Sequence, residues 1–209
     1  MIFDDNSIAS LRNVIKERLS DKRYLHTLGV EKLARRLGSV LLPDKVEELC
    51  VAALLHDVAK EMTYEEHVSL LQNSTVEYTD EDLTVRPALH SIVAVPLIIS
   101  DFKEYATADV CSAVANHTLG APNMSLFDEI IFISDYAEEG RTYRVCVEVR
   151  DYLFDSIRKE NSVEENVNAL HTASLKSIIS TVDSISKRKE MINSRTLMTK
   201  RYLEDIILK

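Results

Sequence analysis

The stretch Pro43-Asp-Lys-Val-Glu-Glu-Leu-Cys-Val-Ala-Ala-Leu-Leu-His-Asp57 is the part of the sequence from which the fold class can be worked out. Proline is favoured in the first turn of a helix, where its missing N–H removes no hydrogen bond. The apolar residues that follow recur at helical spacing, at Val46, Leu49, Cys50, Ala53 and Leu54. This spacing predicts an amphipathic helix whose apolar face runs directly into His56 and Asp57.

The same helical spacing continues on both sides of this stretch. It predicts further helices over residues 8–19, 25–37, 88–100, 107–117, 125–136, 142–158, 163–187 and 196–208, and a short helix capped by Thr63 and Glu66. Residues 73–87 and 119–123 are predicted loops. Glycine and proline number only four each among 209 residues, which argues against a sandwich, barrel or propeller. We therefore expect one all-α domain over residues 1–209, a helical bundle with its core at about 20–140 and a C-terminal helical extension at about 142–208.

The composition excludes several functional classes. The chain carries 34 acidic and 25 basic residues and a net charge of −9, without a run of five or six Lys or Arg, so we expect neither nucleic acid nor a membrane as a partner. The acidic N-terminus and the lack of an apolar run near ~18 residues argue against a signal peptide or a membrane span. Cys50, Cys111 and Cys146 are far apart and odd in number, which predicts reduced cysteines packed at least partly in the core of a cytoplasmic protein.

Six polar residues stand in apolar surroundings where they are expensive to bury. Four histidines lie on, or at the ends of, separate apolar helices, and two aspartates lie in apolar runs: His26, His56, His90 and His117, with Asp57 and Asp135. Any one of them alone would be interpreted as a hydrogen-bonded core residue, because buried carboxylates need a partner or a cation. Six such residues from five helices of one bundle indicate a metal site, and imidazole with carboxylate suits zinc, iron or manganese. His67 and His171 are interpreted as surface or structural histidines.

The order of these residues is similar to that of a known superfamily. His26, then His56-Asp57, and finally Asp135 follow the H…HD…D order of the HD-domain phosphohydrolases. Three longer blocks narrow the match, and they are Lys22 to Val30, His117-Thr118-Leu119-Gly120, and Ile133 to Glu138. Over residues 20–150 the chain resembles the YqeK family of bacterial cytoplasmic enzymes. The resemblance implies an all-α HD-domain bundle and symmetrical hydrolysis of diadenosine tetraphosphate to two ADP by attack of a metal-bound hydroxide.

The resemblance also assigns roles to individual residues. It implies two divalent transition-metal ions, most readily iron, with manganese or zinc as alternatives. One ion is expected on His26, His56, Asp57 and Asp135, and the other on His90, His117 and a bridging Asp57.

Four further residues are expected to contact substrate. If the helix continues past His56, Lys60 shares a face with His56 and Asp57, so that Asp57 and Lys60 are the expected catalytic residues. Thr118 and Gly120 directly follow a ligand and are expected near phosphate, or else they simply make a turn. The resemblance makes Arg141 a phosphate clamp, with a surface salt bridge as the alternative.

Two alternative functions stay open at this point. One is an HD phosphohydrolase for a nucleoside monophosphate, a dNTP or a guanosine polyphosphate alarmone, and the other is a non-catalytic module that binds metal or nucleotide. The chain departs from the family pattern at Ser91, Leu119 and Glu139, where Gly, Thr and Pro are usual, and these changes bear on substrate preference more than on metal binding. The expected partner is a dinucleoside polyphosphate, and the sequence leaves open whether the chain forms a homodimer.

Overall fold

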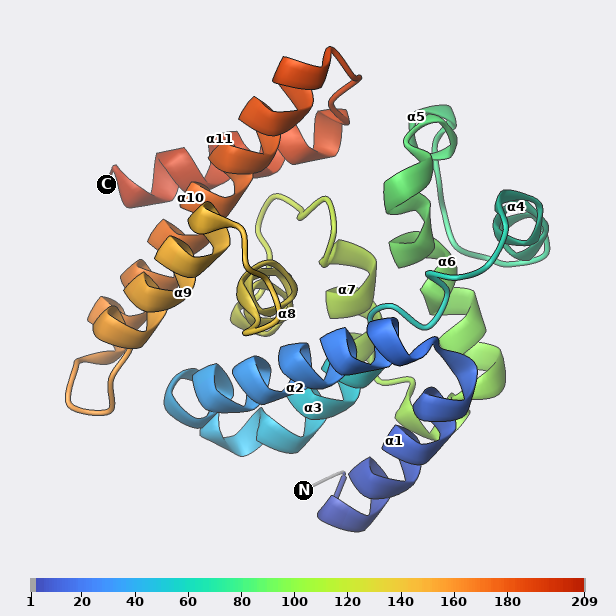
Figure 1. The fold of residues 1–209 in the computed structure, drawn as a ribbon, viewed down its shortest axis with the longest axis horizontal. Helices are drawn as coiled ribbons and strands as arrows, with labels where there is room; N and C mark the ends of the chain where they lie inside the picture. The colour runs from blue at the N-terminus through green and yellow to red at the C-terminus, as the bar shows by residue number, and fades with distance from the viewer. Residues whose placement is uncertain (1–2, 209) are drawn as a thin grey trace.

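The computed structural model describes residues 3–208, which form α-helices and two short 3-10 helices and contain no strand (Figure 1). The α-helices are α1 (Asp5–Arg18), α2 (Asp21–Leu41), α3 (Val46–Leu55), α4 (Tyr64–Gln72), α5 (Asp80–Thr84), α6 (Arg86–Asp101), α7 (Ala108–Asn116), α8 (Leu126–Ala137), α9 (Arg144–Ser156), α10 (Val163–Arg188) and α11 (Ser194–Ile207). The 3-10 helices are η1 (Pro43–Lys45) and η2 (Lys103–Tyr105). The predicted all-α class is confirmed.

Helix α3 lies at the centre of the bundle. Every side chain from Leu49 to Leu55 is fully buried, because α1, α2, α7 and α8 pack around this helix. A helix that is apolar on all sides is stable in water only when neighbours cover it. The hydrophobic core around α3 extends from Phe3 to Leu203 and so includes residues of the C-terminal helices. The residues that follow α3 are therefore held in the middle of the molecule.

Several element boundaries differ from the sequence-based prediction, and three of the differences bear on the site or on a predicted loop. Pro43 opens η1 instead of α3, which begins at Val46. Helix α3 ends at Leu55, and residues 56–61 form turns, so Lys60 does not continue its helical face. The predicted loop 73–87 contains α5, whose Thr79 and Asp82 form a capping box, and α6 then begins at Arg86. This short capping signal lies in a stretch without apolar periodicity, so the periodicity alone could not reveal the helix.

The C-terminal helices close one side of the molecule. Figure 1 shows α10 and α11 side by side, and α10 also packs on α8 and α9. Helix α10 ends at Arg188, and the next residue, Lys189, has a left-handed φ of 58° and reverses the chain toward α11. From α11, Arg195 donates hydrogen bonds to the carbonyl oxygens of Gly120 at 2.7 Å and Ala115 at 2.8 Å. The extension thereby fixes the loop between α7 and α8.

Two further expectations concern the membrane and the cysteines. No helix within residues 3–208 combines the length and the apolar character that a bilayer span requires. The cysteines are free; Cys50 and Cys146 are buried and Cys111 is half-buried, as expected. Burial raises the pKa of the Cys50 thiol to about 12, which makes it a core residue without nucleophilic character.

Candidate metal centre

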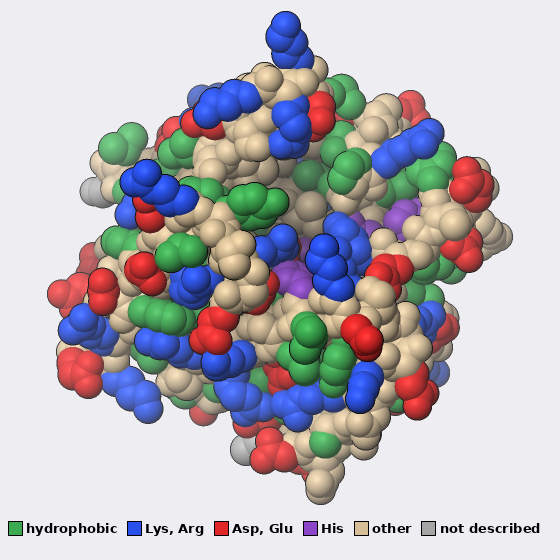
Figure 2. Space-filling view, in the orientation of Figure 1, with side chains coloured by type: hydrophobic (Ala, Val, Ile, Leu, Met, Phe, Trp, Pro, Cys, Tyr) green, Lys and Arg blue, Asp and Glu red, His purple; other side chains and the backbone are tan. Residues whose placement is uncertain are grey.

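The six residues singled out as metal ligands come together at one place in the molecule. His26 lies on α2, His56 and Asp57 follow α3, and the others come from α6, α7 and α8: His90, His117 and Asp135. Figure 2 shows histidine side chains at the bottom of a hollow near the centre of one face, with Lys and Arg side chains beside them. Segments up to about a hundred residues apart thus contribute to one cluster.

The ligand atoms form two overlapping groups that share His56. The first group consists of His26, His56 and Asp135, and the second of His56, Asp57 and His117; within each, the ligand atoms lie within 4.8 Å of one another. In the first group, Nε2 of His26 lies 2.9 Å from Oδ1 of Asp135. Separations of this size allow one cation to contact all members of a group.

Asp57 lies between the two groups and is only 2% exposed. Its Oδ1 atom is 3.1 Å from Nε2 of His90 and 3.7 Å from Nε2 of His117. Its Oδ2 atom is 3.4 Å from Nε2 of His56 and 3.8 Å from Nε2 of His26. Burial raises the pKa of the Asp57 carboxyl, but the facing imidazoles outweigh burial and hold the pKa well below its usual range. Each carboxylate oxygen thus faces a different pair of histidines.

Backbone carbonyl groups orient three of the imidazoles. In each case Nδ1 donates to the carbonyl three residues earlier: His56 to Ala53 at 2.6 Å, His90 to Pro87 at 3.0 Å, and His117 to Val114 at 2.7 Å. A carbonyl oxygen only accepts, so Nδ1 carries a proton, and in the neutral imidazole the lone pair is on Nε2, which faces the cluster. This arrangement of the second ring nitrogen is typical of histidines that ligate metals.

In the neutral rings the resulting lone pairs are suited to bind a cation. Nε2 of His90 and Nε2 of His117 lie 3.1 Å apart, and with Nδ1 protonated on both rings the two atoms present lone pairs to each other. Nε2 of His56 is buried without a hydrogen-bond partner among the described residues. Burial lowers the pKa of His90 to about 4, which keeps it in the neutral, ligating form. These donor atoms therefore satisfy the requirements of a divalent metal site.

The fourth imidazole, His26, is oriented by a carboxylate that sequence reasoning missed. Its Nδ1 donates to Oε1 of Glu138 at 3.1 Å, and Glu138 is 3% exposed. Burial lowers the pKa of His26, but the hydrogen bonds to Asp135 and Glu138 outweigh burial and raise the pKa to about 9. A positive charge at this point, from a proton or from a cation, is what the two flanking carboxylates favour.

Gly29 is the sequence signal that could have identified Glu138. A Cβ atom at Gly29 would lie 2.3 Å from Oε2 of Glu138, so only glycine leaves room for this carboxylate. The backbone N–H of Gly140 donates to the same oxygen at 2.5 Å. The position of the Glu138 carboxylate therefore accounts for glycine at residue 29, near His26, and at residue 140, near Asp135.

Three basic side chains surround the cluster. Arg141, as predicted, lies here, with its Nη2 atom 2.7 Å from Oδ1 of Asp135. Lys60 also reaches the cluster, in spite of the turn, since its Nζ atom is 3.2 Å from either ring nitrogen of His90. Burial lowers the pKa of the Lys60 amine.

Arg23, to which the sequence assigned no role, donates from Nη1 to Oδ2 of Asp57 at 2.6 Å. Its position three residues before His26 on α2 was the available signal.

Thr118 and Gly120 have different surroundings. The Oγ1 atom of Thr118 is 3.3 Å from Nε2 of His90, which places the hydroxyl at the edge of the cluster. Gly120 has a φ of 69°, its N–H donates to the Asn116 carbonyl at 2.9 Å, and its own carbonyl accepts from Arg195. The positive φ and these hydrogen bonds are typical of a turn residue. A contact of Gly120 with phosphate stays a prediction.

The two histidines outside the cluster have structural roles. His67 was expected on a solvated face, but it is 6% exposed and its Nε2 donates to the Ala59 carbonyl at 2.8 Å. His171 lies 2.8 Å from Oε2 of the buried Glu129. The partners of His67 and His171 in these bonds are not among the six candidate ligands. Both histidines are therefore left out of the proposed metal site.

Comparison with known proteins gives one family match. The family model described as "HD domain" matches residues 23–140, a segment that contains all six candidate ligands. A curated relative from Halalkalibacterium halodurans, named as a symmetrical bis(5′-nucleosyl)-tetraphosphatase, is 30% identical over 91% of this chain and 93% of its own length. A relative from Bacillus subtilis with the same name is 25% identical over 90% of this chain and 93% of its own.

A solved structure shows the same fold. It comes from Clostridium acetobutylicum and is described as a predicted HD superfamily hydrolase involved in NAD metabolism. The two chains superpose with a TM-score of 0.81 at 28% sequence identity, over 95% of this chain and 97% of the other. The similarity therefore includes the C-terminal helices as well as the segment that the family model covers.

Proposed function

The chain belongs to the HD-domain family, and from this premise we propose that it hydrolyses diadenosine tetraphosphate symmetrically to two ADP, with two divalent metal ions in the His/Asp cluster. Its relatives make the chain a hydrolase of the HD superfamily. The observation that carries the proposal is the pair of overlapping ligand groups around His56 and Asp57. The names of the relatives support the choice of substrate.

The ligand set divides between two ions. We assign His26, His56, Asp57 and Asp135 to one ion, and His90, His117 and a shared Asp57 to the other. When bound, such ions supply a nucleophilic water at neutral pH and positive charge against the phosphate oxygens. Imidazole and carboxylate donors suit iron, manganese and zinc alike. Resemblance to the family supports iron as the metal.

The chain's own residues contribute binding, orientation and charge. Arg23 and Arg141 each hold one ligand carboxylate in place and leave the other guanidinium N–H groups for phosphate oxygens. Lys60 adds an amine on the His90 side, where it offsets charge on the leaving chain. Attack of water at an inner phosphorus with cleavage of the central P–O–P bond gives ADP from both halves of the substrate, whereas cleavage of an outer P–O–P bond gives AMP and ATP.

A product assay tests this function against its rivals. The purified protein is loaded with Fe²⁺ or Mn²⁺, incubated with diadenosine tetraphosphate, and the nucleotides are separated by chromatography. ADP as the sole product supports the proposal, and AMP with ATP rejects the symmetrical assignment. Turnover of a nucleoside monophosphate, a dNTP or a guanosine polyphosphate in place of this substrate favours the other phosphohydrolases. No turnover of any nucleotide favours a binding module. The Asp57→Ala protein, purified in parallel, controls for contaminating phosphatases.

A further inference from the structure

Two pockets of the molecule share Arg141 in their linings. The first, of about 780 Å³, is lined from the α2 side by residues that include Arg23, Leu25 and His26. The second, of about 590 Å³, lies between the start of α9 and the end of α10, and its lining includes Tyr143 and Arg188. Arg141 is the one residue that lines both pockets. The two pockets therefore meet at a cationic side chain.

Arg141 also links this wall to the metal ligands. It donates to Asp135 at 2.7 Å, and the same Asp135 oxygen lies 2.9 Å from Nε2 of His26. His26 lines the first pocket and Asp135 lines the second. Each pocket therefore includes one candidate metal ligand together with Arg141, so a polyphosphate bound at the cluster borders on both pockets.

The second pocket has the chemistry to bind a nucleoside. Tyr143 caps α9 and is 75% exposed, so its ring is free to stack against a base. The guanidinium of Arg188 donates from Nη1 to Oγ of Ser184 on α10 at 2.8 Å, and it is also paired with Glu190 at 2.9 Å. Among the residues that line this pocket, Asp135 is the only acidic one. The lining therefore offers two guanidinium groups, each paired with a carboxylate, and the exposed ring of Tyr143.

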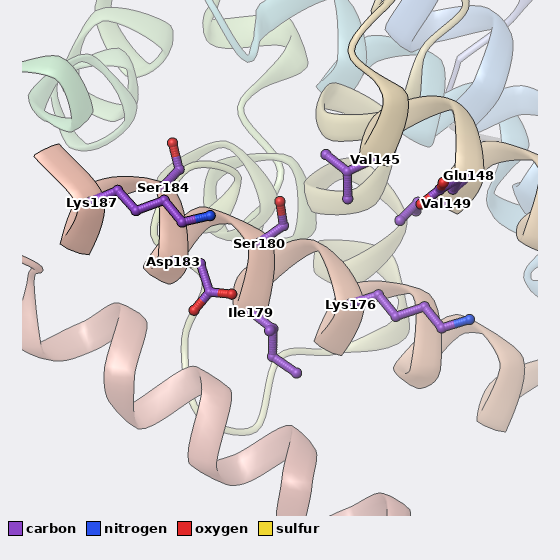
Figure 3. A pocket seen from close by; sticks show the side chains of 9 residues that line it. All are labelled: Val145, Glu148, Val149, Lys176, Ile179, Ser180, Asp183, Ser184 and Lys187. Atoms are coloured by element: carbon purple, nitrogen blue, oxygen red, sulfur yellow. The ribbon is translucent and has the colours of Figure 1, made fainter.

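The second pocket continues outward along α10. A neighbouring pocket of about 570 Å³ shares Val145, Ser180 and Ser184 with it. Figure 3 shows the side chains of Ser180 and Ser184 rising from the same side of α10, with Lys187 beyond them. This continuation gives a nucleoside room past Tyr143 and offers hydroxyl groups to a ribose.

Resting on the proposed function, we infer that the pocket between Tyr143 and Arg188 binds one nucleoside of a dinucleoside polyphosphate, while the pocket beside Leu25 binds the other. The phosphate chain then crosses Arg141, and its central part lies nearest to the metal ligands. Occupation of both pockets thereby selects the middle of the chain for hydrolysis. Tyr143 and Arg188 act as specificity-determining residues, and a substrate with a single nucleoside does not need them.

Steady-state kinetics on four variants test this inference. Stacking of a base on an aromatic ring predicts that Tyr143→Ala raises KM for diadenosine tetraphosphate by about 5-fold to 100-fold, with kcat within twofold of the parent. Tyr143→Phe keeps the ring and should stay within twofold in KM. Arg188→Ala should raise KM severalfold. Arg144→Ala is the matched control, since Arg144 is an exposed arginine paired with Glu148 and lines none of the three pockets.

A ligand with a single nucleoside distinguishes a defect in the second pocket from a general loss of substrate binding. Adenosine 5′-tetraphosphate, used as a competitive inhibitor, should keep its inhibition constant within twofold in Tyr143→Ala, because the pocket beside Leu25 can still hold it. An unchanged KM in Tyr143→Ala would overturn the inference, and so would an inhibition constant that rises as much as KM. If the parent enzyme releases no ADP at all, the proposed function itself fails. Melting curves of each variant confirm that the fold is intact.

Discussion

Asp57 is the residue on which the proposed chemistry depends most directly. Each of its two carboxylate oxygens faces a pair of histidines, and Arg23 holds one of the oxygens at 2.6 Å. Loss of this side chain therefore removes a ligand from both proposed ions at once. Asp57→Ala should reduce the metal content to well below one ion per chain and abolish hydrolysis. Elemental analysis and a product assay on the same preparation measure both effects.

Two basic residues serve as the comparison for Asp57. Lys60→Ala and Arg141→Ala should leave the metal content near that of the parent and lower kcat or raise KM by about 10-fold to 1,000-fold, because they act on phosphate charge and not on coordination. Should these variants lose the metal while Asp57→Ala retains it, the ligand assignment would be wrong.

Gly29 allows a second prediction about a single residue. Gly→Ala within a helix usually gains about 1 kcal/mol, but here the added Cβ would lie 2.3 Å from Oε2 of Glu138. Glu138 must then move and can no longer orient His26. Gly29→Ala should therefore weaken metal affinity by about 10-fold to 100-fold, as is typical when the hydrogen-bond partner of a metal ligand is lost. Metal titration of the stripped protein measures the change.

Gly38→Ala is a matched control on the same helix. Its Cβ would lie 2.5 Å from Cδ1 of Leu49, far from the metal ligands, so it should lower the melting temperature without affecting metal affinity. Equal metal affinity in Gly29→Ala and the parent would mean that Glu138 does not orient His26.

At the scale of elements, α4 supports the turn that carries His56 and Asp57. His67 donates from α4 to the Ala59 carbonyl within this turn at 2.8 Å. Its replacement by alanine leaves a buried acceptor without its partner, which costs about 1–3 kcal/mol. For a chain of this length His67→Ala should lower the melting temperature by about 2–12 °C, while the metal content of the folded protein stays near that of the parent. Calorimetry and elemental analysis test the two parts, and a variant that melts like the parent would contradict the structural role of His67.

Helix α11 supports the second ligand turn, the loop that follows His117. Arg195 donates to the carbonyl oxygens of Gly120 and Ala115 and to Oδ1 of Asn116 at 2.9 Å. Arg195→Ala should release this loop, so amide hydrogen exchange should accelerate over residues 117–124 and kcat should fall. Arg201→Ala, an exposed arginine on the same helix, is the control and should change neither quantity. Unaltered exchange in Arg195→Ala would show that α11 is not needed to order the loop.

The helices were predictable from the sequence because apolar periodicity is a local property. The end of α3 was not, since the apolar residues Leu55, Val58 and Ala59 continue the helical spacing while the chain already turns at His56. Lys60 reaches His90 through this turn and not along a helical face. The supports from α4 and α11 were also hidden, because a hydrogen bond between Arg195 and Gly120 depends on packing between distant segments.

At the scale of the whole molecule, the sequence indicated which residues gather but not how they are oriented. The six candidate ligands could be chosen because charged and imidazole side chains are costly among apolar neighbours. The structure adds the groups that orient them, such as Glu138 behind His26 and the carbonyl behind His117. The pockets that share Arg141 form from α2, α9 and α10 together, so no local pattern announces them.

The proposed metal site predicts that the stability of the whole fold depends on bound metal. Nε2 of His90 and Nε2 of His117 lie 3.1 Å apart, Asp57 lies close to the imidazole of His56, and Asp135 lies close to that of His26. A cation relieves this crowding of lone pairs only in the folded state, because the unfolded chain separates the ligands. Metal at about 100 times its dissociation constant stabilises a fold by about 2.7 kcal/mol, which corresponds to about 5–11 °C in melting temperature for a chain of this size.

Removal of the metal should therefore lower the melting temperature as well as abolish hydrolysis. The test is calorimetry of the protein before and after treatment with a chelator, with elemental analysis of each sample, and again after Fe²⁺ or Mn²⁺ is added back. We expect a decrease of at least about 5 °C that the added metal reverses. Asp57→Ala is the control, since it lacks the ligand shared by both ions and its melting temperature should hardly respond to the chelator. A stripped parent protein that melts at the same temperature as the loaded one would mean that the cluster binds no metal tightly enough to stabilise the fold.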